Sequence, residues 1–306
     1  MIVVVGEQIV DRVVQPDGGI VDVAGGAPAN VAVALGMLGD RVAMRARVSR
    51  DEYAPLLRAR LRAATVADDL LVTADGATST ALVRTDDEGR ASYEFALDGA
   101  VDWQWTDDEL TGTADGAAAL VVGSLAMAMR PGCDAVERMV AMTSSTDVPV
   151  IYDANLRASL RHPSAEHTRI ERQVLLADVV KVSDEDLALT HPHDDPRIVA
   201  LRWSEVDRLV VLTLGARGSV AFRDGAVVAE VPALPIDVVD TIGAGDAFLA
   251  GLVHVLTGRA PGACERARWD GGDVTEALSF ATRVAAICCT HVGAYAPRID
   301  DVVATA

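Results

Sequence analysis

Short runs of β-branched residues alternate with helical patterns along most of this 306-residue chain. Such runs are typical of strands that are buried on both faces, and helices between them make neighbouring strands parallel. The order therefore predicts an α/β fold, with helices on each face of a mostly parallel sheet. The predicted strands are MIVVV, RVAMRARV, AALVVGS, VPVIYDA, DVVKVS and RLVVLTLG, and the predicted helices span about residues 28–38, 52–63, 132–142, 166–176 and 196–202.

Two segments interrupt this alternation. Residues 9–24 and 78–96 are typical of β-hairpins, because Asp17-Gly18-Gly19 and Asp87-Glu88-Gly89 supply turn residues. They predict a small β-sheet lid, built from insertions at about 9–24 and 78–102, on a single domain that spans residues 1–306. Isolated two-stranded ribbons are marginally stable and expose their edges, which predicts a homodimer formed through the lid.

The composition excludes several classes of partner. A net charge of −18 disfavours nucleic acid and anionic membrane as partners. No apolar run approaches the ~20 residues that a membrane helix requires, so we expect a cytoplasmic protein. Lys181 is the only lysine, and a Walker P-loop, which requires a Gly-Lys pair, is absent. Nucleotide phosphates would therefore have to be bound by a different arrangement of residues.

The segment VVDTIGAGDAFLAGL, residues 238–252, carries the strongest functional signal. A strand-like run ends at Asp240, and a helix that is apolar all round begins near Gly245. The N-terminus of that helix offers unpaired N–H groups to an anion, and Gly243 and Gly245 leave them accessible. Asp246 follows in the first turn. Phosphoryl transfer needs both an anion site and a base for the attacking hydroxyl, although an empty glycine-rich turn is the alternative.

DTIGAGDAF resembles the second signature of the PfkB carbohydrate kinases, which have the ribokinase-like fold. GGAPANVAVALGMLG (25–39) is similar to the first signature of the family, VVLTLGARGSVAF (210–222) to its nucleotide-binding segment, and AAICCTHVGAYAP (285–297) to the helix and turn that flank adenine. These matches cover nearly the whole length in the family's order. The resemblance implies a three-layer ribokinase-like sandwich and an enzyme that uses ATP and Mg2+ to phosphorylate a primary hydroxyl of a small sugar.

The resemblance also assigns roles around the two signatures. Asp246 matches the catalytic base, and Gly243, Ala244 and Gly245 match the anion hole. The sugar-binding residues that the resemblance implies are Asp11, Gly25, Gly26 and Asn30. Asp240 lies where some members bind a monovalent cation such as potassium (K+), and a helix-capping role is the alternative.

Two further stretches match the family with differences. YDANLRASL (152–160) resembles a stretch of fructokinases and 2-keto-3-deoxygluconate kinases, in which Arg157 would contact the transferring phosphate or a substrate oxygen. KVSDEDLAL (181–189) takes the place of an Asn-x-x-Glu element, with Ser183 for Asn and Asp186 for Glu. Because Asp is shorter, we expect Asp186 to contact magnesium through water. The ATP-binding residues implied are Lys181, Ser183, Thr213, Gly215, Gly218, Gly243 and Gly245.

Fructose is the expected acceptor, because GEQIVD, DANLR and GAYAP all resemble fructokinase sequences. The alternatives are 2-keto-3-deoxygluconate and then ribose or a nucleoside. A carboxylate acceptor would need a further cation, which Arg12, Arg84 or Arg90 of the lid segments would supply. A non-catalytic sugar-binding regulator on the same fold is an alternative of another class, disfavoured because the base and the glycines are both present. His191 and His193 are expected in a solvated turn rather than a metal site.

Overall fold

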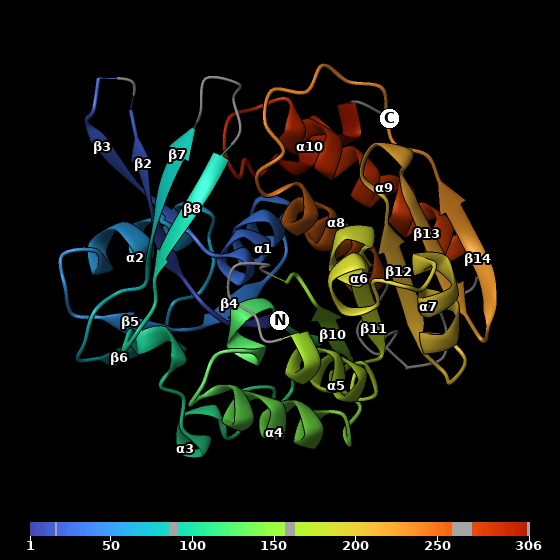
Figure 1. Ribbon diagram of the computed structural model, residues 1–306, viewed down its shortest axis with the longest axis horizontal. Helices are drawn as coiled ribbons and strands as arrows, with labels where there is room; N and C mark the ends of the chain where they lie inside the picture. The colour runs from blue at the N-terminus through green and yellow to red at the C-terminus, as the bar shows by residue number, and fades with distance from the viewer. Residues whose placement is uncertain (16, 86–90, 157–162, 259–270, 305–306) are drawn as a thin grey trace.

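The structure is a computed structural model that describes residues 1–15, 17–85, 91–156, 163–258 and 271–304. Its main sheet confirms the predicted parallel architecture (Figure 1). Pairs along it are parallel except for the last two, at the β14 edge. The strands lie in the order β14 (Ala226–Val231), β13 (Ser219–Arg223), β12 (Leu209–Thr213), β11 (Val179–Ser183), β10 (Val150–Asp153), β9 (Ala119–Gly123), β1 (Ile2–Val5) and β4 (Val42–Arg45).

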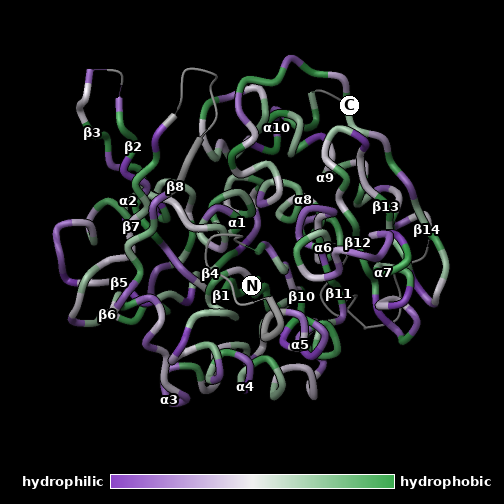
Figure 2. Tube along the Cα trace, in the orientation of Figure 1, coloured by the Kyte–Doolittle hydropathy of each residue, from purple (hydrophilic) through white to green (hydrophobic). Residues whose placement is uncertain are grey.

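Helices cover both faces of the main sheet. Alternate residues of β1 show this directly, because Ile2 and Val4 belong to one buried cluster and Val3 and Val5 to the other. One cluster includes residues of α1 (Ala27–Met37), α8 (Ala244–Gly258) and α9 (Gly271–Cys289). The other includes residues of α4 (Cys133–Thr143), α5 (Pro163–Val174), α6 (Asp184–Thr190) and α7 (Pro196–Trp203). The predicted three-layer sandwich is therefore confirmed. In Figure 2 the apolar α8 contrasts with hydrophilic outer segments such as α3 (Asp107–Leu110).

The two predicted hairpins are confirmed, but they are not isolated ribbons. β2 (Ile9–Val14) pairs with β3 (Ile20–Gly25), and β7 (Thr80–Thr85) pairs with β8 (Ala91–Ala96). Parallel pairing of β2 with β7 joins them into one four-stranded sheet, in the order β3-β2-β7-β8, which we call the small sheet. It projects at one side of the main body in Figure 1. The predicted turn at Asp87-Glu88-Gly89 lies outside the described residues.

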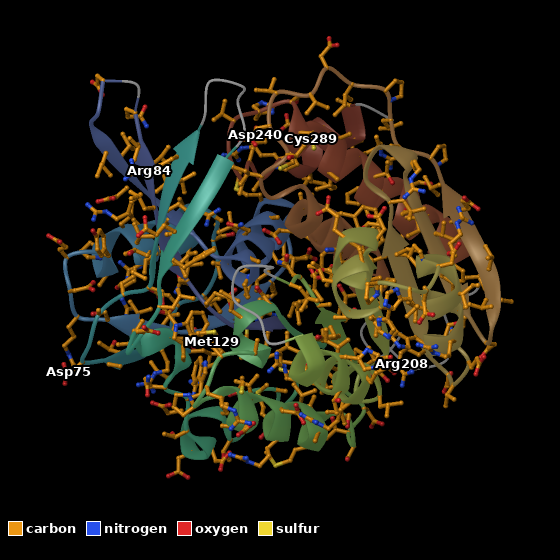
Figure 3. All side chains as sticks on the ribbon, in the orientation of Figure 1. Asp75, Arg84, Met129, Arg208, Asp240 and Cys289 are labelled. Atoms are coloured by element: carbon orange, nitrogen blue, oxygen red, sulfur yellow. The ribbon has the colours of Figure 1, made fainter. Side chains whose placement is uncertain are left out.

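Two strand predictions are wrong. RVAMRARV is not one strand, because after β4 the chain leaves the main sheet and β5 (Arg47–Ser49) pairs with β6 (Val72–Ala74). The run that ends at Asp240 forms no strand, since residues 232–241 are irregular. Pro232 and Pro235 lack the N–H groups that a ladder needs. The N–H groups of Val239 and Asp240 instead donate to the Cys289 carbonyl at 2.8 and 3.3 Å, where α9 ends (Figure 3).

The remaining helices complete the covering layers. α2 (Ala54–Ala63) contacts α1 and β3, and α10 (Ile299–Ala304) contacts α9. The helix predictions agree with the structure to within about three residues at each end, and boundaries are where sequence-based predictions err most. Of the helices described, none combines the length and the apolarity needed to cross a bilayer.

Candidate active site

A pocket lies at the carboxyl ends of β1, β9 and β10. The strand order reverses at β1, because the chain continues to β4 on one side of it and to β9 on the other. Such switch points are where open α/β sheets bind their ligands. Gly123, Ser124, Asp153, Asn155 and Asp246 contribute its polar lining.

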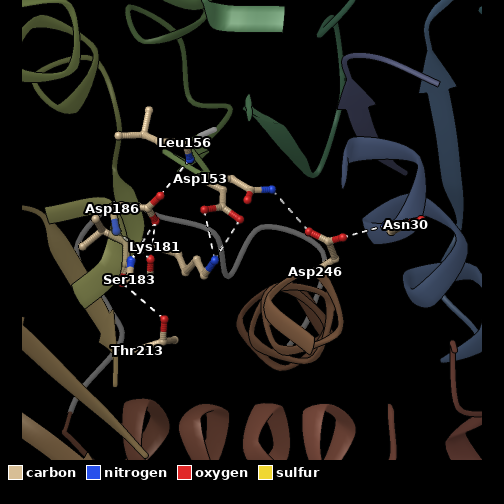
Figure 4. A network of polar contacts seen from close by, with 10 residues as sticks. Asn30, Asp153, Leu156, Lys181, Ser183, Asp186, Thr213 and Asp246 are labelled. Carbon is tan, nitrogen blue, oxygen red and sulfur yellow. Dashed lines mark hydrogen bonds and ion pairs between the residues drawn. The ribbon is translucent and has the colours of Figure 1, made fainter. Parts of the chain in front are cut away.

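The Asp246 carboxylate is held at this pocket by two amide side chains. It lies in the first turn of α8 and is only 7% exposed. Its Oδ2 accepts a hydrogen bond from Asn30 Nδ2 at 2.7 Å, and its Oδ1 accepts from Asn155 Nδ2 at 3.4 Å (Figure 4). Asn30 comes from the first turn of α1, and Asn155 follows β10. Three segments far apart in the sequence therefore orient one carboxylate toward the pocket.

Arg60 of α2 orients Asn30 in turn. Its Nη2 donates to Asn30 Oδ1 at 2.7 Å, so the amide nitrogen of Asn30 must face Asp246. Burial lowers the pKa of Arg60, while the negative charges of Asp246 and Asp11 oppose that shift. An arginine remains charged under these conditions. Nothing in the local sequence distinguishes Arg60 from the other two arginines of this helix.

Lys181 forms a buried ion pair with Asp153 beneath the glycine loop. Its Nζ lies 3.2 and 3.1 Å from the two carboxylate oxygens, and a Cβ at Gly245 would come within 3.2 Å of Nζ. Burial raises the pKa of Asp153 to about 7, although the Lys181 charge opposes this. Burial would lower the pKa of Lys181, but the charges of Asp153, Asp186 and Asp246 outweigh it and raise that pKa. Lys181 is thus a fixed positive charge next to the loop.

Ser183 and Asp186, the two departures from the family pattern, form a capping box at the start of α6. Asp186 Oδ2 accepts from the backbone N–H and the hydroxyl of Ser183 at 3.0 and 2.6 Å. Its Oδ1 accepts from the Leu156 N–H at 2.7 Å (Figure 4). The pair therefore caps α6 and fastens the segment that follows β10. The water-mediated magnesium contact of Asp186 stays a prediction.

The glycine loop is fastened to the turn that follows α9. Gly243 has φ of +78°, and a Cβ there would come within 2.6 Å of the Cβ of Ala294. Asp240 accepts hydrogen bonds from the N–H groups of Ile242 at 3.0 Å and Gly293 at 2.7 Å. These bonds give Asp240 a turn-stabilising role, and cation binding there stays a prediction. The Ala244 N–H donates to the Thr241 carbonyl at 3.2 Å, so Gly243 and Gly245 are the remaining donors of the predicted anion hole.

The other predicted sugar-binding residues, Asp11, Gly25 and Gly26, lie together at the start of α1, the helix that carries Asn30. A Cβ at Gly25 would come within 2.3 Å of Asp11 Oδ2, so the Asp11 carboxylate lies against the di-glycine backbone. Gly26 has φ of +99°, and a Cβ there would come within 2.7 Å of the Glu7 carbonyl oxygen. Only glycine suits such a conformation and such a close approach. The charges of both Asp11 and Asp246 act on Arg60, which contacts Asn30, so the structure brings this turn and the base to one part of the molecule.

The other predicted nucleotide residues follow β12. Thr213 ends that strand, and its hydroxyl donates to the Val182 carbonyl at 3.4 Å. Gly215 begins and Gly218 follows the 3-10 turn Gly215–Arg217. A Cβ at Gly218 would come within 2.1 Å of the Val231 carbonyl oxygen, which indicates a packing role. Arg157 lies outside the described residues. The site also includes Arg60, Asp153 and Asn155, which the sequence did not single out, although the last two lie inside the DANLR stretch.

Comparisons with known proteins identify the family of the chain. The profile of the pfkB family carbohydrate kinases matches residues 1–301. The chain is 32% identical over 257 residues to a fructokinase of Klebsiella pneumoniae, covering 83% of each chain. The structure resembles that of Vibrio cholerae O395 fructokinase in its fructose-, ADP- and calcium-bound form, with a TM-score of 0.87, 26% identity and coverage of 99% and 97%. It also resembles aminoimidazole riboside kinase of Salmonella enterica, with a TM-score of 0.84, 25% identity and coverage of 99% and 98%.

The chain belongs to the pfkB family of carbohydrate kinases, and its fold is the ribokinase-like α/β fold. It is therefore a sugar kinase, an enzyme that uses ATP with a divalent metal ion to phosphorylate a sugar.

Proposed function

We propose that this kinase phosphorylates a primary hydroxyl of fructose, with Asp246 as the general base. The observation that carries this proposal is the Asp246 carboxylate, buried at the N-terminus of α8 and oriented toward the pocket by Asn30 and Asn155. The fructokinases among its relatives support fructose as the acceptor.

In the proposed reaction the acceptor hydroxyl gives its proton to Asp246. The acceptor oxygen bonds to the γ-phosphorus of ATP, the bond between that phosphorus and the bridging oxygen breaks, and ADP leaves. Charge on the moving phosphoryl group would be stabilised by the N–H groups of Gly243 and Gly245 and by the α8 dipole. Lys181, whose ammonium group lies next to Gly245, adds positive charge at the same place.

We propose Mg2+ as the divalent ion and Asp186 as its nearest protein group, acting through water. Hard carboxylate oxygens suit this ion, and it is usually held mainly by nucleotide phosphates. When bound, it would neutralise charge on those phosphates. The buried carboxylates Asp153, at the end of β10, and Asp186, in the first turn of α6 after the neighbouring β11, offer oxygens that fit such an ion. A potassium ion near Asp240 remains part of the proposal.

The charges of Arg12 and Arg60 favour a neutral acceptor over 2-keto-3-deoxygluconate, whereas Arg90, another candidate cation, lies outside the described residues. Arg12 of the small sheet has its Nε 3.0 Å from Asp22 Oδ1, which balances its charge. The charge of Arg60 is balanced by the negative charges of Asp246 and Asp11. A carboxylate acceptor would need a cation that is not already balanced by acidic groups. A sugar with hydroxyl groups can instead exchange hydrogen bonds with Asp11 and Asn30.

The acceptor is tested by measuring ADP release with MgATP against fructose, 2-keto-3-deoxygluconate, ribose, adenosine, aminoimidazole riboside and inositol. We expect kcat/KM for fructose to exceed that of every other compound by ~100-fold, about 2.7 kcal/mol in transition-state binding. A higher kcat/KM for another compound would replace fructose as the acceptor. Tight sugar binding without ADP release would instead favour the non-catalytic regulator.

We also propose that the small sheet forms a homodimer interface. Ile20, Val21 and Val23 of β3 are 47%, 49% and 46% exposed, and β3 is an edge strand of this sheet. An edge with exposed β-branched residues is a surface on which another strand can pair. The two hairpins already stabilise one another within the chain, so their marginal stability no longer argues for a dimer. The exposed edge strand β3 is what supports the dimer.

A further inference from the structure

His167, Glu171 and His191 form a cluster that the proposed reaction does not use. His167 and Glu171 lie one turn apart on α5, and His191 follows the last residue of α6. One potential ligand atom from each lies within 4.8 Å of the others. The prediction of a solvated turn is therefore wrong for His191, which is 4% exposed, and holds for His193, which is exposed. Packing of α5 against α6 buries His191, which local sequence could not reveal.

The hydrogen bonds of the two imidazole rings set the tautomer of His167 and place His191 Nε2 against Glu171. His167 Nδ1 lies 3.0 Å from the Thr190 carbonyl oxygen, which can only accept, so this nitrogen carries the proton and Nε2 has the lone pair. His191 Nδ1 lies 3.0 Å from the Thr190 hydroxyl, and His191 Nε2 lies 3.0 Å from Glu171 Oε1. Histidines that bind metals usually donate their other N–H group in this way.

The Thr190 hydroxyl limits which ring nitrogen of His191 carries the proton. Its oxygen also lies 3.1 Å from the Asp186 carbonyl, and its one hydrogen cannot serve both that carbonyl and His191 Nδ1. If the hydroxyl donates to the carbonyl, His191 Nδ1 must be the protonated nitrogen, and a bare Nε2 then faces a carboxylate. A metal cation between Nε2 and the carboxylate satisfies every one of these groups.

Glu171 is itself oriented and accessible. Trp203 Nε1 donates to its Oε1 at 2.9 Å, and Arg202 Nη2 lies 3.6 Å from the same oxygen. The Glu171 side chain is 36% exposed, so an ion can reach the cluster from solvent.

We propose that His167, Glu171 and His191 bind one divalent transition-metal ion of the zinc class. Two imidazole nitrogens and one carboxylate oxygen are a ligand set that zinc takes in proteins, with water in the fourth position. Ligand atoms around tetrahedral zinc lie about 3.3 Å apart for bonds of about 2.0 Å, so the cluster needs only small side-chain movements. If His191 starts in the other tautomer, with its proton on Nε2, that proton leaves when the metal binds.

The ion would join α5 to the C-terminal end of α6. The N-terminal end of α6 carries the Ser183 and Asp186 capping box, which fastens Leu156 beside the active site. The expected role is therefore to stabilise the two helices that support that segment, and the reaction itself needs no group from this site.

The test is titration of tag-free, metal-free protein with Co2+, followed by its visible absorption bands and by competition with Zn2+. The variants are His167→Gln and Glu171→Gln, whose side chains are partly exposed, with His193→Gln as the matched control on the neighbouring turn. An Asp246→Asn background separates this site from the active-site carboxylates. Circular dichroism of each metal-free variant checks that it is folded.

We expect one Co2+ per chain, displaced by Zn2+, and a rise in Tm when Zn2+ is added. His167→Gln and Glu171→Gln should each weaken binding by at least ~10–100-fold and abolish the Tm rise, whereas His193→Gln and Asp246→Asn should change neither. The proposal is overturned if folded His167→Gln binds Co2+ as the parent does, or if the parent shows no stoichiometric binding. Loss of binding in Asp246→Asn would assign the ion to the active site instead.

Discussion

The amide of Asn30 donates a hydrogen bond of 2.7 Å to the carboxylate of Asp246, across 216 positions of the sequence. This contact joins the first turn of α1 to the first turn of α8, and with them the two signature segments of the family. Because Asn30 is itself held by Arg60, the orientation of the base depends on a helix that carries no recognisable motif.

Replacing the base tests the chemistry directly. We expect Asp246→Asn to lower kcat by ~10²–10⁴-fold or more, because proton removal by a positioned base contributes that much. Binding of fructose and ATP, measured by calorimetry, should remain within a few-fold of the parent. Near-normal turnover in this variant would contradict the assigned mechanism.

Arg60 is predicted to be a positioning residue that acts through Asn30. Arg60→Met keeps the length of the side chain but removes the bond to Oδ1, so both KM for the sugar and kcat should worsen. We expect a combined loss in kcat/KM of ~10–100-fold, the effect of one hydrogen bond to a charged group. Arg60→Lys should recover part of this loss.

The matched control is Arg62→Met, on the same helix, whose partner Asp68 lies away from the pocket. Equal kinetics of Arg60→Met and the parent, or equal losses in both methionine variants, would remove Arg60 from the site.

The glycine loop should not tolerate a side chain at its first glycine. Gly243→Ala places a Cβ in a left-handed conformation and 2.6 Å from Ala294, which forces the loop away from the turn after α9. We expect weaker ATP binding and a lower kcat, measured by nucleotide titration and steady-state kinetics. Gly258→Ala, where the added methyl meets open space, serves as the control and should behave like the parent. Unchanged ATP affinity in Gly243→Ala would argue against this loop as the anion site.

Asp102 predicts a pH dependence of stability. Burial raises its pKa from 3.8 to about 6, despite hydrogen bonds from Ser79. The folded state therefore binds more protons than the unfolded state between these values, and the free energy of unfolding falls as pH rises through this window. Asp102→Asn should raise the free energy of unfolding by up to about 3 kcal/mol at pH 8 and by little at pH 4. Urea unfolding at both pH values measures this, and equal effects at both would contradict it.

The homodimer prediction depends on the exposed edge of the small sheet. Val21→Asp adds a charge to β3 without touching the main sheet, so sedimentation velocity should show a shift from dimer to monomer. Met142→Asp, at an exposed apolar residue of α4, is the control and should leave the dimer intact. A monomeric parent at working concentration would rule the dimer out.

Much of the fold follows from local sequence patterns. Alternating apolar runs and helical periods set the three layers, because strands and helices bury their faces with fixed periods. Gly243 and Gly245 at the start of α8, with Asp246 next to them, also point to an anion site and a base, since all three lie on one short segment. The splitting of RVAMRARV and the irregular run before Asp240 were missed because strand formation depends on a partner strand elsewhere in the chain.

By itself, then, the sequence determined the architecture, the family and the short segment that carries the base. Only the tertiary structure decided which distant side chains meet: Arg60 on Asn30, Lys181 beneath Gly245, and His191 beside His167 and Glu171. The two hairpins likewise became one sheet through a parallel pairing of β2 with β7. The physical reason is that local periodicity fixes how each segment folds, whereas contacts between segments depend on how those segments pack together.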